Sequence, residues 1–272
     1  MFKIRGFKTP YFNRRVDTML VDINKLSKLN NLLHDDLMNF ENYIYDLLSI
    51  VKNMSFYWHD GYTVSFFGKI NNVQNDVADL INSLYSLLNC LMSVYSHYNN
   101  INELKGDIGL WGIVNSDNFS INEMDDENMA IKKNILNNKV MYAEDDISFN
   151  LNKVKDIVVQ AIEFKNLEIN NDSSDFVGMD DIMSTEIERF NEKLLFFNSY
   201  STKLISDMYS LPKIYQSVNS NKFMSKVELI NDSFNMIEKN FFNAYEYINE
   251  RIKGAVQSID DIIDDIRGRF NK

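Results

Sequence analysis

Few side chains in this sequence have the type and spacing that catalysis or metal binding requires. Histidine occurs three times, at His34, His59 and His97, and cysteine occurs once, at Cys90. In a helical hairpin that bends near residue 59, His34 and His97 would lie ~20 Å apart along the axis, too far to share a metal ion. No His-x-x-x-His or Cys-x-x-Cys spacing is present. The histidines therefore predict no metal site.

Two acidic groups are the remaining candidates for a carboxylate site. One is Glu186-Ile-Glu188, and the other, near the end of the sequence, consists of Asp260, Asp261, Asp264 and Asp265. Carboxylate metal sites in helical bundles usually recruit His at Glu-x-x-His spacing, and neither group has such a His. We expect both groups to lie on solvated helix faces.

The single thiol is expected to be buried and unreactive. Cys90 is flanked in the sequence by Leu87, Leu88 and Leu91, and a cysteine in apolar surroundings behaves as a small hydrophobic residue. A Gly-rich phosphate loop, a nucleophile elbow and a kinase motif set are all absent. The sequence therefore predicts a protein that is not an enzyme and has no catalytic residue, cofactor or metal.

Composition indicates which elements form the protein. Of 272 residues, 45% are hydrophobic, whereas only two are proline and nine are glycine. Sheets and tight turns need more Pro and Gly than this, so we expect an all-α fold with long helices. The net charge of −11 argues against binding to nucleic acids or to anionic membranes. The basic N-terminal segment is an exception to this acidity, with Lys3, Arg5, Lys8, Arg14 and Arg15.

The spacing of apolar residues predicts the course of the chain. Helices are expected over about 13–53, 63–100, 145–169, 179–211 and 221–267, with bends at 55–62 and 212–220. A loop is expected at 107–115 and a short helix from Ser120, which has capping-box spacing to Glu123. Pro212 marks the end of the fourth of these helices. The predicted domains are a first hairpin at 1–105, a connector at 106–145 and a second hairpin at 146–272.

The two hairpins also resemble each other in sequence. A shift of 157 positions aligns residues 26–94 with 183–251 without a gap, and large apolar positions coincide throughout. The aligned pairs include Leu33 with Phe190, Phe40 with Phe197, Tyr43 with Tyr200, Phe66 with Phe223, Val77 with Phe234, and Leu84 with Phe241. Because the agreement continues across the bend, we predict an internal repeat. We call 26–94 the first copy and 183–251 the second copy.

Residues at the bend resemble the W-x-G motif of the WXG superfamily, small helical hairpins associated with type VII (Esx) secretion in bacteria. Trp58, Gly61 and Phe66 match the Trp, the small residue and the Phe that follows about eight positions after the Trp. Two residues rather than one separate Trp58 from Gly61, so the strict motif is absent. In the second copy Tyr215, Ser217 and Phe223 stand at the corresponding places.

The resemblance implies a fold and a function. Family members pair as dimers that form four-helix bundles, so two copies in one chain imply a monomeric pseudo-dimer, two tandem antiparallel hairpins in one elongated four-helix bundle with a helical connector. Its function would be that of a secreted factor of a type VII pathway, or of an escort that binds an effector or the secretion machinery through helix faces. The family's export signal is a Tyr followed four residues later by an acid, and Tyr142 with Asp146 fits this spacing.

Localisation and two alternative functions follow from the same residues. We expect no signal peptide and no membrane-spanning segment, hence synthesis in the cytoplasm and, if the chain is exported, secretion without signal-peptide cleavage. The first alternative is a cytoplasmic structural or adaptor bundle unrelated to secretion. The second is a membrane-active helical toxin in which Ile108 to Val114 inserts into the bilayer.

Overall fold

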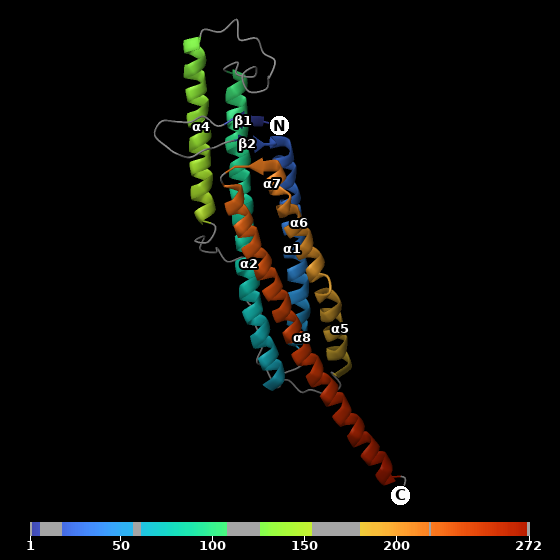
Figure 1. Cartoon of the computed structure of the whole chain (residues 1–272). Helices are drawn as coiled ribbons and strands as arrows, with labels where there is room; N and C mark the ends of the chain where they lie inside the picture. Colours follow the sequence, from blue (N-terminus) through green and yellow to red (C-terminus); the bar gives the residue numbers. More distant parts are fainter. Residues whose placement is uncertain are drawn as a thin grey trace. The chain divides into compact units, whose positions relative to one another are not determined.

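The computed structural model describes residues 2–5, 18–56, 61–107, 126–153, 180–217 and 219–270. This part of the chain is almost entirely helical, which confirms the all-α class predicted from composition (Figure 1). The elements are β1 (Phe2–Arg5), β2 (Thr18–Val21), α1 (Ile23–Met54), α2 (Gly61–Asp107), α4 (Asp126–Lys153), α5 (Asp180–Leu194), α6 (Phe197–Tyr209), α7 (Leu211–Ile214), β3 (Tyr215–Gln216) and α8 (Ser220–Phe270). The bounds of α2 and α8 agree closely with the helices predicted over 63–100 and 221–267.

The predicted start of the first helix, at about residue 13, is wrong for the described residues 18–21. Residues 18–21 form β2, which pairs antiparallel with β1 and β3. Helix α1 begins at Ile23, and the carboxylate of Asp22 caps it by accepting a hydrogen bond from the Lys25 amide at 3.1 Å. Met19 and Leu20 continue the helical spacing of apolar residues, but two such residues fit a short strand equally well. Periodicity alone therefore did not locate the start of the helix.

The outgoing helix of the second copy is also not continuous. The prediction of one helix over 179–211 is wrong, because α5 ends at Leu194, residues 195–196 form a turn, and α6 begins at Phe197. The turn contains neither Gly nor Pro, so the sequence carries no ordinary signal for it. Pro212 lies in the first turn of α7, where its missing N–H costs no intrahelical hydrogen bond.

The connector is more helical than the sequence suggested. Helix α4 already begins at Asp126 and extends to Lys153, so the predicted boundary between residues 145 and 146 falls inside a helix. The predicted loop beyond residue 107, the short helix at Ser120 and the helical residues 154–169 lie outside the described residues, as does the segment 108–114 of the toxin hypothesis.

The chain divides into two compact units. Unit 1 consists of Met1–Leu37, Asn82–Val158 and Lys203–Asn231, and unit 2 consists of Met38–Ile81, Val159–Thr202 and Asp232–Lys272. Each unit therefore contains segments of both copies. Much of each unit corresponds, in the predicted repeat, to a segment of the other unit. The 157-residue shift carries 23–37 of unit 1 onto 180–194 of unit 2, and 46–74 of unit 2 onto 203–231 of unit 1.

The two cores differ in how they are filled. Unit 1 has an aliphatic centre with a small cavity of about 10 Å³, lined by Leu33, Leu37, Leu84, Leu87, Leu88, Leu91, Leu204 and Met208. Unit 2 is centred on aromatic rings that contact edge to face, among them Phe40, Phe66, Phe190, Phe197, Phe234 and Phe241. Such edge-to-face pairs contribute beyond the area they bury, by roughly 0.5–1.5 kcal/mol each.

The sequence led us to expect no membrane-spanning segment, but one stretch of α2, Val64–Glu103, is long and apolar enough to cross a bilayer. In the protein, 56% of the most apolar part of this stretch is buried. Core helices of water-soluble proteins can be equally long and apolar. The buried residues of this stretch include Phe66, Ile70, Val77 and Leu91.

Candidate functional site

The first bend motif is described only in part. Trp58 lies outside the described residues, and Gly61 is the first residue of α2. Phe66 is completely buried, with its ring 6.3 Å from that of Phe190 in a T-shaped contact. Phe66 thus packs against a residue of the second copy within unit 2.

The second bend motif is fully described apart from residue 218. Tyr215 is completely buried in β3, and its ring lies 6.0 Å from that of Phe223, edge to face. The Ser217 hydroxyl accepts a hydrogen bond from the Asn219 amide at 3.0 Å, which fixes the turn before α8. Tyr215, Ser217 and Phe223 therefore build one local structure.

A carboxylate from α4 completes this structure. Glu144 accepts hydrogen bonds from the hydroxyls of Tyr98 and Tyr215, the latter at 2.8 Å, and from the side-chain amide of Asn219 at 2.8 Å. The same amide also donates to the Glu144 carbonyl at 2.9 Å. Burial, followed by the negative charge of Glu144, raises the pKa of Tyr98 and of Tyr215. Both tyrosines are therefore neutral donors at physiological pH.

The Glu144 carboxylate holds α4 against the second bend. One of its oxygens accepts from the hydroxyls of Tyr98 and Tyr215, and the other accepts from the side-chain amide of Asn219. No motif in the sequence singles out Glu144, although the adjoining face of α4 is buried at Val140, Ala143, Ile147 and Leu151.

The candidate export signal lies on the opposite side of α4. Tyr142 is 69% exposed, and Asp146 is also exposed. Phe149, one further turn along, is exposed as well. Tyr142 and Asp146 are therefore accessible while Glu144 keeps the helix docked.

The other chemically capable residues do not converge in the described part of the chain. Cys90 is buried as expected, and burial raises the pKa of its thiol to about 12. Glu188 is exposed as expected, whereas Glu186 is buried, contrary to the expected solvated face, and forms an ion pair with Arg189 at 2.7 Å. His34 is exposed, and His59 lies outside the described residues. Among the described residues there is no group of three or more His, Cys, Asp or Glu with metal-site geometry.

Aromatic rings of the two copies contact each other in pairs. In unit 2, Tyr43 stacks on Tyr200 with ring centroids 4.8 Å apart, and Phe40 lies 5.8 Å from Phe197. The 157-residue shift carries each member of these pairs onto the other. Equivalent positions thus meet each other, as they do on the axis of a two-fold dimer.

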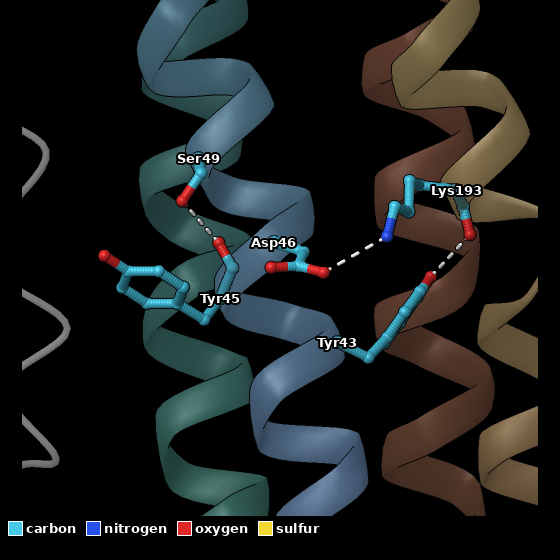
Figure 2. Close-up of polar contacts among 5 residues, drawn as sticks. All are labelled: Tyr43, Tyr45, Asp46, Ser49 and Lys193. Atoms are coloured by element: carbon cyan, nitrogen blue, oxygen red, sulfur yellow. Dashed lines mark hydrogen bonds and ion pairs between the residues drawn. The ribbon is translucent and has the colours of Figure 1, made fainter.

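Polar contacts between the copies accompany these rings. Figure 2 shows Tyr43 and Asp46 reaching toward Lys193, whereas Tyr45 points to the other side of α1. The Tyr43 hydroxyl donates to the Lys193 carbonyl at 2.9 Å, and the Lys193 ammonium lies 3.1 Å from the Asp46 carboxylate. Burial raises the pKa of Tyr43, so its hydroxyl remains a donor at neutral pH.

None of the protein families, curated proteins or solved structures with which the chain was compared matches it.

Proposed function

We propose that this chain is a non-enzymatic helical protein of a type VII (Esx-like) secretion pathway, either a secreted factor or an escort of an effector. Its architecture in this proposal is a pseudo-dimer, two tandem antiparallel hairpins packed as a four-helix bundle with α4 as a helical connector. The observation that carries the proposal is the meeting of equivalent residues, Tyr43 with Tyr200 and Phe40 with Phe197. The resemblance to WXG-like hairpins, which pair as dimers in a four-helix bundle, supports the same interpretation.

The exposed apolar residues support recognition of a protein partner through helix faces. Large apolar side chains stand exposed on helices α1 and α4 and in the turn before α6, among them Tyr45, Tyr142, Phe149, Leu195 and Phe196. Exposed aromatic residues on rigid helices are typical anchors of protein interfaces. The proposed partner is therefore a protein, such as an effector or a component of the secretion machinery, and no cofactor takes part.

Measurement of export into the medium tests this proposal directly. The tagged chain is expressed in a bacterium that has a type VII pathway, with and without the pathway's ATPase, and cells and medium are blotted beside a cytoplasmic marker. We expect the chain in the medium only when the ATPase is present. Retention in both strains would contradict the secreted form and leave a cytoplasmic escort or an adaptor unrelated to secretion.

The candidate signal has a matched control on α1. Tyr142→Ala is expected to abolish export, because Tyr142 is the aromatic residue of the Tyr-x-x-x-acid pattern. Tyr45→Ala removes an equally accessible ring, 66% exposed against 69% for Tyr142, and should leave export unchanged. Equal export of the two variants would remove Tyr142 and Asp146 from the proposal without affecting its other parts.

A further inference from the structure

In each unit an ion pair between described residues joins the two copies. In unit 1 the Lys203 ammonium contacts the Asp36 carboxylate, and in unit 2 the Lys193 ammonium lies 3.1 Å from Asp46. The repeat relates the two pairs, because the 157-residue shift carries Asp36 onto Lys193 and Asp46 onto Lys203. Each pair therefore joins the same two repeat positions, with the roles of the copies exchanged.

The charges are divided between the copies without mixing. The first copy has Asp at both positions, and the second copy has Lys at both. If two first copies paired in the same way, Asp36 would face Asp46 of the other copy. If two second copies paired, Lys193 would face Lys203. Only the pairing of a first copy with a second copy places opposite charges at both contacts.

We propose that Asp36, Asp46, Lys193 and Lys203 set the pairing specificity of the two hairpins, so that the occupant of each hairpin's apolar face is the other hairpin of unlike charge. This inference rests on the pseudo-dimer architecture proposed above. Like-charge contacts disfavour wrong partners more strongly than ion pairs stabilise the right one. The four residues therefore act chiefly by excluding pairing of like copies between chains.

The two contacts differ in weight because their surroundings differ. Asp36 is 5% exposed, whereas the side chains of Asp46 and Lys193 are 59% and 43% exposed. Removal of the partner of a buried charge costs more than breaking a solvated pair. Asp207, one turn from Lys203 on α6, also faces Asp36, and its pKa is raised by burial and by that carboxylate. Asp36 is thus the acid most dependent on Lys203.

The test is a charge-exchange cycle in the full chain. Variant D36K/D46K makes both copies basic, variant K193D/K203D makes both acidic, and the fourfold variant restores opposite charges with the signs exchanged. We expect each double variant to lower the urea midpoint by about 0.5–1 M. K193D/K203D should lose more, because Asp36 would then face an acid at position 203 as well as Asp207. The fourfold variant should recover more than half of either loss.

A matched control separates pairing from net charge. Variant D35K/E188K has the same charge change as D36K/D46K at two exposed acids, and its urea midpoint should move by less than about 0.2 M. A fourfold variant whose loss equals the sum of the two double variants would overturn the proposal, as would a control that loses as much as D36K/D46K.

The exposed pair keeps the test valid if a double variant does not fold. Asp46→Lys, Lys193→Asp and their combination alter only half-exposed side chains, which tolerate substitution. Recovery in the combination is expected, and additive losses would again overturn the proposal. Export is measured separately, so a failed cycle leaves the secretion proposal intact, and failed export leaves the charge specificity intact.

Discussion

At the scale of single residues, Asp207 is expected to make the stability of the fold depend on pH. Burial and the nearby Asp36 carboxylate raise the pKa of Asp207 above its ordinary value of 3.8, and Lys203 partly offsets this. The folded state therefore binds the Asp207 proton more tightly than the unfolded state does. This group destabilises the fold at neutral pH, and the loss disappears as the pH falls through the raised pKa toward 3.8.

Asp207→Asn tests this linkage. The amide removes the repulsion from Asp36, so we expect greater stability at pH 7, by no more than about 1 kcal/mol because the site is partly solvated. The advantage over the native chain should shrink as the pH approaches 4. Urea unfolding at a series of pH values measures it. A constant difference at every pH would show that Asp207 does not titrate with folding.

Cys90 is the residue whose behaviour the sequence predicted best. Its leucine neighbours predicted burial, and the thiol is 3% exposed with its pKa raised to about 12. The thiolate is the reactive form, so we expect almost no reaction with a thiol reagent at pH 8 in the folded protein and rapid reaction in urea. Rapid reaction without denaturant would contradict the burial.

Glu144 shows the limit of such reasoning. Local sequence indicates which helix face is buried, but the donors of Glu144 come from Tyr98, Tyr215 and Asn219, 46, 71 and 75 residues away. Nothing in the spacing of these residues predicts that they meet. Trp58, the first residue of the bend motif, lies outside the described residues.

At the scale of elements, Glu144 determines how α4 is held. Glu144→Ala removes the acceptor for two buried tyrosine hydroxyls, and we expect a loss of about 2–4 kcal/mol because these donors become unsatisfied. Hydrogen exchange over 140–151 should accelerate, since α4 undocks. Asp145→Ala, at an exposed neighbour, is the control and should change neither quantity. Equal effects of both substitutions would exclude docking through Glu144.

The core positions of the repeat support a second element-scale prediction. Leu33 and Leu84 border the small cavity of unit 1, whereas their equivalents Phe190 and Phe241 contact each other in unit 2. Phe241→Leu should cost about 1–2 kcal/mol, because it leaves a cavity among aromatic rings. Leu84→Phe should raise the melting temperature, because the ring extends into existing space. A loss typical of overpacking, about 1–3 kcal/mol, would contradict this for Leu84→Phe.

The long helices were predictable and the short elements were not, for one physical reason. Helices α2 and α8 are 47 and 51 residues long and repeat their apolar spacing turn after turn, so their pattern is redundant. Strand β3 has two residues and depends on pairing with β2, whose register is Leu20 with Gln216 and Val21 with Tyr215. The turn at 195–196 lies between the fully buried residues Leu194 and Phe197. Pairing and packing between residues far apart in the sequence are not encoded in local spacing.

At the scale of the whole molecule, the repeat is the feature that links sequence to fold. Each unit contains segments of both copies, and much of one unit corresponds in the predicted repeat to segments of the other. The hydrophobic pattern alone predicts that the copies are equivalent. The division of charge between them is visible in the sequence only after the structure shows which positions face each other, as with Asp46 and Lys193.

The proposed pseudo-dimer predicts a monomer in solution. In that proposal both copies that a WXG-like dimer needs are present in one chain, so we expect no pairing of the hairpins with a second chain. We expect light scattering to give the mass of one chain over a wide range of concentrations. We also expect the urea midpoint to be independent of protein concentration, since only oligomers unfold with a concentration-dependent midpoint. A stable dimer whose midpoint rises with concentration would show that the hairpins pair between chains. In that case the charges at Asp36, Asp46, Lys193 and Lys203 would specify an exchange of copies between two chains.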